Sequence, residues 1–190
     1  MKDAGNGEVR ILGIPGSIRR GSCSVAILEA LCRRLSDRGA ARMTVFHLRD
    51  IPPYNSDLEG DECPVPVLSL RGEIQAAHAL LLCSPEYNHG VSGVLKNALD
   101  WASRPALQSP LKDKLVLTIS SSPGVTGGVR AHQQLRDTLF STLSRVVPPE
   151  VVIGSVYQKM SDGVFADESN LRYADEALDG LIAQARRGAR

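Results

Sequence analysis

Short runs of aliphatic and β-branched residues alternate along the chain with longer stretches whose apolar residues recur at helical spacing. The short runs predict strands over residues 9–14, 43–48, 79–84, 115–120 and 151–156. The longer stretches predict helices from residue 22 to Gly39, around 70–77, over 93–102, over 129–145, and over 171–185. In the fourth helix the pattern places Leu135, Leu139 and Leu143 inward.

This alternation indicates a parallel sheet covered on both faces, because neighbouring parallel strands need right-handed crossover connections. We predict an α/β, flavodoxin-like three-layer sandwich with a five-stranded parallel sheet in the order 2-1-3-4-5. Residues 1–190 are expected to form one domain, with the polar residues 1–8 disordered. In such a sheet ligands bind beyond the carboxyl ends of the strands, between strands one and three. The loops after strands one, three and four therefore hold the candidate site.

Composition narrows the possible partners. Lys and Arg total 22 against 21 for Asp and Glu, so a net charge of +1 favours neither nucleic acid nor an acidic membrane surface. The longest apolar run, residues 76–83, is much shorter than the roughly 20 residues of a membrane span. The N-terminal residues lack the layout of a secretory signal, so we expect a cytoplasmic protein.

The cysteines and histidines give no metal-binding or disulfide pattern. The four cysteines are widely spaced, and no two histidines lie three or four residues apart. We therefore expect reduced thiols and no metal. Cys32 and Arg38 match the Cys-x5-Arg spacing of a phosphatase loop, but the residues between them lack glycine and continue a helical pattern.

Glycines and hydroxyl side chains follow the first strand and lead into a helix. A helix N-terminus presents unpaired N–H groups and a positive dipole, and Ser17, Ser22 and Ser24 add hydroxyl groups beside the Arg19 guanidinium. The loop matches neither the triphosphate nor the dinucleotide glycine pattern. A terminal phosphomonoester, such as that of FMN, suits it. The alternative is an ordinary Gly/Ser turn in which Ser22 caps the helix.

The segment after the third strand carries a specific resemblance. Pro85-Glu-Tyr-Asn88, followed by Gly-x-Leu-Lys-Asn-Ala-x-Asp-Trp101, resembles the signature of the NADPH-dependent FMN reductase family, which includes quinone- and chromate-reducing flavoproteins and related azoreductases. The Gly-Ser-x-Arg-x-x-Ser loop and residues 120–130 are similar to the same family, so the resemblance covers the chain from about residue 9 to the last helix. Many quinone and chromate reductases of the family have Asn where this chain has Ser24, which leaves the subfamily open.

The resemblance implies that FMN is bound by these loops. Pro85 and Tyr87 offer a flat surface to the flavin ring, and backbone amides near Glu86 and Asn88 offer donors. Ser121, Gly124 and Gly127 are within reach of the ring or the ribityl chain, although an ordinary strand-to-helix turn tolerates the same residues. In the helix that follows, we expect Leu95, Leu99 and Trp101 in the core, while Lys96, Asn97 and Asp100 have either a structural role or a ligand contact.

The implied activity is an NAD(P)H-dependent oxidoreductase. Hydride passes from NADPH or NADH to bound FMN and then to a quinone, azo, chromate or flavin acceptor, with the cofactor performing the chemistry. We assign no catalytic side chain. Arg20, Arg104 and Arg130 are candidates for contacting the 2′-phosphate of NADPH. Members of the family commonly assemble, which implies a homodimer or homotetramer.

Two other functions compete with the reductase. A flavodoxin-type electron carrier would bind FMN without nicotinamide turnover, but the balanced charge of this chain differs from the acidic docking surface of such carriers. A phosphate-binding protein without redox activity would leave the second loop unexplained.

Overall fold

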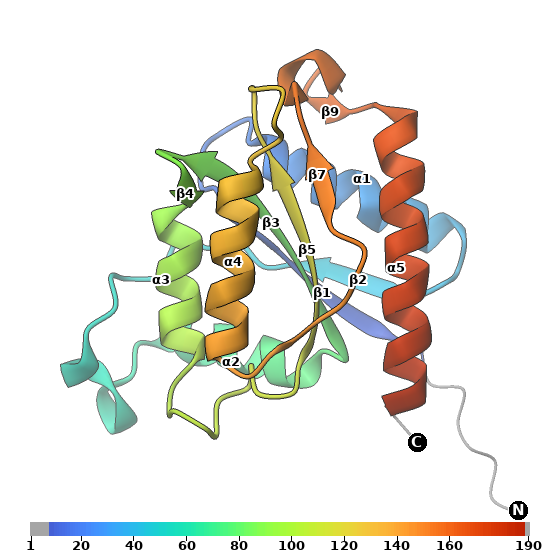
Figure 1. Ribbon diagram of the computed structural model, residues 1–190. Coiled ribbons are helices and arrows are strands. Elements are labelled where there is room, and N and C mark those ends of the chain that lie inside the picture. Colours follow the sequence, from blue (N-terminus) through green and yellow to red (C-terminus); the bar gives the residue numbers. More distant parts are fainter. Residues whose placement is uncertain (1–7, 189–190) are drawn as a thin grey trace, which may run out of the picture.

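The computed structural model describes residues 8–188 and shows an α/β fold with a mostly parallel central sheet (Figure 1). The prediction of disorder over residues 1–8 lies outside the described residues, except for Glu8, which is exposed. The main strands are β1 (Arg10–Pro15), β2 (Arg42–Val45), β3 (Ala79–Tyr87), β4 (Gly90–Val91), β5 (Leu115–Ser121), β6 (Arg145–Val146) and β7 (Val151–Ile153). The helices are α1 (Cys23–Asp37), α2 (Val65–Ala76), α3 (Gly93–Ala102), α4 (Val129–Ser141) and α5 (Glu168–Gly188).

The strand order confirms the predicted topology with one refinement. The sheet runs β2-β1-β3-β5, and its last position is shared by two short strands, β6 and β7, which both pair in parallel with β5. Pro148 and Pro149 lie between the two and have no N–H to donate to a ladder, which separates β6 from β7. The fifth strand, predicted over residues 151–156, ends at Ile153. A further strand, β4, pairs antiparallel with β3, so the sheet has 7 strands rather than five.

Two layers of helices cover the sheet (Figure 1). Helices α1 and α5 bury their apolar faces in one cluster, which includes the predicted inward positions of the last helix. Helices α2, α3 and α4 pack against the opposite face in a second cluster. Between α1 and α5, the buried Asp175 carboxylate accepts a hydrogen bond from Arg34 Nε at 2.6 Å and lies 3.3 Å from an Arg38 nitrogen.

The fourth helix ends earlier than predicted. It stops at Ser141, and Leu143 has φ +62 and is 46% exposed, so the prediction of an inward Leu143 is wrong. The Arg145 amide instead donates to the Lys114 carbonyl at 2.8 Å, which draws the chain into β6 beside β5. Strand pairing therefore overrides the helical pattern of the sequence at this point.

The third strand continues past its predicted end. It pairs with β5 as far as Pro85, and its last two residues pair with β4 across a two-residue turn. Asn88 and His89 form that turn with φ +49 and +66, the two positive values that a type I′ hairpin requires. Residues 85–87, predicted to lie in a loop, are thus held in a strand.

The remaining segments are short 3-10 helices and a small hairpin. They are η1 (Ser56–Leu58), η2 (Gly60–Glu62), η3 (Val156–Lys159) and the antiparallel pair β8 (Met160–Ser161) and β9 (Val164–Phe165). No helix within residues 8–188 has the length and apolar character needed to cross a membrane.

Candidate functional site

A cavity of about 220 Å³ opens at the carboxyl edge of the sheet, beside the ends of β1, β3 and β5. Eight of the eleven predicted site residues line it: Ser17, Arg19, Ser22, Ser24, Pro85, Glu86, Tyr87 and Ser121. Asn88, Gly124 and Gly127 do not line it. The structure thus brings the first two loops and the end of β5 together at the place expected for a ligand of a parallel sheet.

The loop after β1 is packed tightly against β3. The Gly16 amide donates to the Cys83 carbonyl at 2.7 Å, and a Cβ on Gly16 would lie 3.0 Å from Ser92 Oγ and 3.1 Å from Pro85 Cδ. This close approach favours glycine, because the neighbours of a larger residue would have to shift. Ser17, the next residue, has a buried side chain, and the buried Ser24 belongs to the first turn of α1, where N–H groups have no acceptor within the helix. The result is a cradle of donors suited to a phosphate.

Ser22 has the capping role that the sequence left open. Its Oγ accepts a hydrogen bond from the Val25 amide at 3.3 Å and so caps α1, while the same residue lines the cavity. Behind the loop, burial raises the pKa of the Cys83 thiol to about 12, an effect that Ser24 and Ser121 partly oppose. Cys83 is therefore a neutral, inaccessible thiol at neutral pH.

Glu86 has a structural use that the sequence did not indicate. Its carboxylate accepts hydrogen bonds from the Arg130 and Ala131 amides, each at 3.1 Å, and so caps α4, whose own N-cap residue is Gly128. Arg130 also contacts His89, with 2.5 Å between an Arg130 terminal nitrogen and His89 Nδ1. Because the carboxylate is bonded to α4 in this way, we expect Glu86 to contact a ligand through its backbone.

Tyr87 and Asn88 differ in their position at the cavity. Tyr87 lines it and is 52% exposed, so its ring stands at the mouth. Asn88 occupies the hairpin turn, where Asn tolerates a positive φ better than most residues do. A contact between Asn88 and FMN stays a prediction.

The loop after β5 is shaped by its packing on β7. Gly127 has φ +67, and a Cβ there would lie 2.5 Å from Val152 Cγ1 and 2.9 Å from the Gly154 nitrogen. That close approach accounts for Gly127 without a ligand. Gly124 donates its amide to Ser122 Oγ at 3.1 Å, and its carbonyl accepts from the Ser155 amide at 3.1 Å.

Four residues that the sequence analysis did not select also line the cavity: Cys23, Pro123, Val156 and Tyr157. Tyr157 is the most informative, since it stands 58% exposed on η3 and comes from the segment after β7. The Val156 amide donates to the Ser122 carbonyl at 3.0 Å, which holds η3 against the loop after β5. Tyr157 is not among the residues predicted from the sequence, because the pattern predicts a strand as far as residue 156. In the structure β7 ends at Ile153, and η3 carries Tyr157 back to the cavity.

The motif on α3 has a structural role. Asn97 Nδ2 and Trp101 Nε1 both donate to the Pro52 carbonyl at 2.8 Å, and the Tyr54 amide donates to Asn97 Oδ1 at 2.7 Å. These bonds fasten the long segment after β2 to α3. Lys96 pairs with Asp100 at 2.7 Å, and the expected core positions Leu95, Leu99 and Trp101 are buried.

The structure also bears on the competing motifs. Cys32 lies within α1 and Arg38 is the C-cap of the same helix, and Arg38 pairs with Asp179 at 3.2 Å, so the two residues do not frame a phosphatase loop. Within residues 8–188, no group of three or more His, Cys, Asp or Glu side chains is arranged to hold a metal ion.

Comparisons with known proteins agree with this geometry. The model of the NADPH-dependent FMN reductase family matches residues 9–158. The NAD(P)H-dependent FMN reductase of Pseudomonas aeruginosa is 37% identical over 183 residues, covering 95% of this chain and 97% of that protein. The quinone reductase of Escherichia coli is 36% identical over 156 residues and covers 82% of each chain. The solved flavoenzyme NAD(P)H:(acceptor) oxidoreductase of Paracoccus denitrificans superimposes with a TM-score of 0.75 at 28% identity, covering 94% of this chain and 98% of that one.

Proposed function

This chain belongs to the NADPH-dependent FMN reductase family, and from that premise we propose that it binds FMN in the cavity described above, oxidises NADPH or NADH and reduces a quinone. The observation that carries the proposal is the meeting of a phosphate cradle and a flat platform in one cavity. Ser17, Ser22 and Ser24 line it together with Pro85 and Tyr87. These are the two surfaces that a flavin mononucleotide needs.

The residues present fit FMN. The buried hydroxyl groups of the first loop, the first turn of α1 and the Arg19 guanidinium supply hydrogen bonds and positive charge to a terminal phosphate. The strand that carries Pro85 is fixed by its pairing with Ser121, so the platform is rigid. The partly open cavity leaves one face of a ring placed there accessible to a second molecule.

When bound, FMN supplies the redox chemistry by accepting a hydride from the nicotinamide and then passing two electrons to the acceptor, with protons taken from solvent. The chain positions the reactants and excludes water from one face of the ring. Glu86, whose carboxylate is committed to capping α4, is not assigned as an acid or base. The mechanism therefore names no catalytic side chain.

Quinones are the acceptor class we favour. Tyr87 and Tyr157 place exposed aromatic rings at the cavity mouth and Pro123 adds apolar surface, and such a rim suits a flat, uncharged acceptor. Azo compounds and free flavins share this flat shape, while chromate does not. The single-domain organisation, the cytoplasmic location and the homodimer or homotetramer stay predictions.

The experiment is an anaerobic visible spectrum of the purified protein reconstituted with FMN, before and after addition of NADPH and then of a quinone. We expect the bound flavin to bleach with NADPH and to recover its colour with the quinone. A bound flavin that NADPH and NADH both leave oxidised would instead indicate an electron carrier. Failure to bind FMN at all would exclude both functions.

A further inference from the structure

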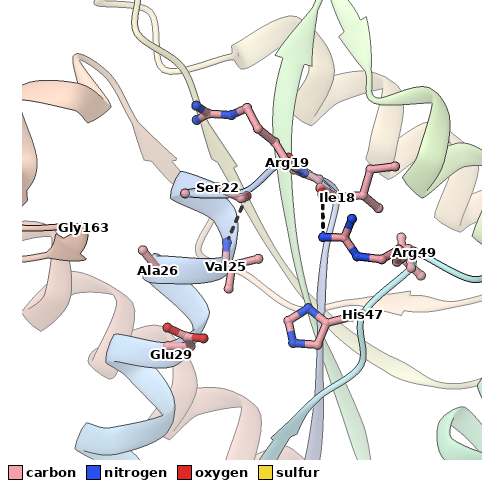
Figure 2. Close-up of a pocket in the computed structure, with 12 residues that line it drawn as sticks. Ile18, Arg19, Ser22, Val25, Ala26, Glu29, His47, Arg49 and Gly163 are labelled. Carbon is pink, nitrogen blue, oxygen red and sulfur yellow. Dashed lines mark hydrogen bonds between the residues drawn. The ribbon is translucent and has the colours of Figure 1, made fainter.

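A second cavity, of about 300 Å³, adjoins the candidate flavin cavity (Figure 2). The two share Ser17, Arg19 and Ser22 as a common wall. Because β1 and β2 are parallel, the segment that follows β2 emerges at the same sheet edge as the phosphate loop. That segment, the first turns of α1 and the β8–β9 hairpin supply the rest of the lining, which includes His47, Arg49, Glu29 and Gly163.

The charges in this cavity are unevenly placed. Figure 2 shows His47 and Arg49 approaching from one segment, with Glu29 on α1 across from them. Arg49 donates from a terminal nitrogen to the Ile18 carbonyl at 3.0 Å, which places the guanidinium beside the phosphate loop. A guanidinium has five N–H donors, so others remain available to a ligand. Within the described part of the chain, neither His47 nor Arg49 forms an ion pair with a carboxylate.

The arginines expected from the sequence to meet a 2′-phosphate do not line either cavity. Arg104 lies 3.8 Å from the Glu59 carboxylate and over the Tyr54 ring, and Arg130 contacts His89. Arg20 is exposed on the phosphate loop. Arg49 is better placed than any of the three, because it lines the cavity next to the candidate flavin cavity and is hydrogen-bonded to the phosphate loop.

We propose that this second cavity binds the 2′-phosphate-bearing ribose of NADPH, with Arg49 and His47 contacting the phosphate. The proposal rests on the proposed function, since a dinucleotide with its nicotinamide over the flavin must extend out of the first cavity. Arg19 and Ser22 form the wall it would cross. The Glu29 carboxylate repels a phosphate from its own end, which directs the group toward Arg49. NADH lacks this phosphate, so the cavity selects NADPH.

The first test measures binding without turnover. FMN-loaded protein is titrated with 2′,5′-ADP and with 5′-AMP, which lacks the 2′-phosphate. We expect 2′,5′-ADP to bind about 10- to 100-fold more tightly, the range that hydrogen bonds to a charged group provide. Arg49→Ala and Arg49→Gln should abolish the difference. Arg20→Ala is the matched control, because Arg20 is an exposed arginine that lines neither cavity, and it should preserve the difference.

The second test is kinetic. In Arg49→Gln we expect the KM for NADPH to rise by about 10-fold or more, with kcat and the KM for NADH unchanged. The Gln side chain keeps a donor for the Ile18 carbonyl, and the flavin spectrum of each variant reports whether the FMN site is intact.

Three results would overturn the proposal: equal affinities for the two nucleotides, retention of the difference in both Arg49 variants, or release of FMN by 2′,5′-ADP. The last would show that the probe occupies the flavin cavity. If the protein binds FMN but NADPH does not reduce it, the proposed function fails, while the titration with 2′,5′-ADP still decides whether this cavity recognises the phosphate.

Discussion

Replacing Asn97 by alanine tests whether the motif on α3 is structural. The variant loses two hydrogen bonds to the segment after β2, one to the Pro52 carbonyl and one from the Tyr54 amide. Pro52 keeps its bond from Trp101, so the Tyr54 amide is the group left without its acceptor. Each lost bond costs about 1 kcal/mol, and the higher helix propensity of alanine returns up to about 0.7 kcal/mol.

We therefore expect Asn97→Ala to lower the free energy of unfolding by about 1.5 kcal/mol and the Tm by about 3–6 °C for a chain of this size. Urea and thermal unfolding of the apoprotein measure the change. The dissociation constant for FMN, followed by quenching of flavin fluorescence, should stay at the wild-type value, because Asn97 does not line the flavin cavity.

The matched control is Lys96→Ala on the same helix. Its pair with Asp100 is partly exposed, with 45% of the Lys96 side chain accessible, and such a pair contributes at most about 0.5 kcal/mol. The reasoning is refuted if Asn97→Ala keeps wild-type stability but binds FMN much more weakly, since Asn97 would then be a ligand contact.

Three further outcomes follow from the contacts of single side chains. Glu86→Ala should lower the free energy of unfolding by about 1–2 kcal/mol through loss of the α4 cap, with Glu86→Gln intermediate, and an unchanged urea midpoint would contradict that role. Asp175→Ala should lower the free energy of unfolding in urea by about 2–3 kcal/mol, which is less than the loss of a fully buried ion pair costs, because Arg34 is 32% exposed. The control Glu176→Ala, at an exposed position on the same helix, should be nearly neutral. Burial lowers the pKa of His132 below its usual value, so its contribution to stability is complete above about pH 6.5 and is lost as the pH falls below that value. Urea unfolding between pH 7.5 and 5.5 should therefore show a smaller fall in the free energy of unfolding for His132→Gln than for the wild type. The fall that remains in the variant comes from His78, whose pKa is also lowered. Equal falls in the two proteins would rule the effect of His132 out.

Local patterns in the sequence determined the main elements of this protein and the place of its site. The alternation of strand-like and helix-like periods predicted the parallel sheet and its order, because crossover connections leave few topologies. The glycines and serines after the first strand and the Pro-Glu-Tyr-Asn segment after the third predicted which loops come together at the site. Eight of the predicted residues line one cavity for that reason.

Only the tertiary structure decided where elements end and what each polar side chain contacts. The fourth helix stops where Arg145 pairs with β5, and β3 continues because β4 folds back on it. Glu86 caps a helix that begins 43 residues later at Val129, and Tyr157 reaches the cavity from beyond β7. The periodicity of a helix or strand relates residues only a few positions apart, whereas these contacts join residues far apart in the chain, so the periodicity does not predict them. The cavity beside Arg49 likewise exists only once β2 and the phosphate loop lie side by side.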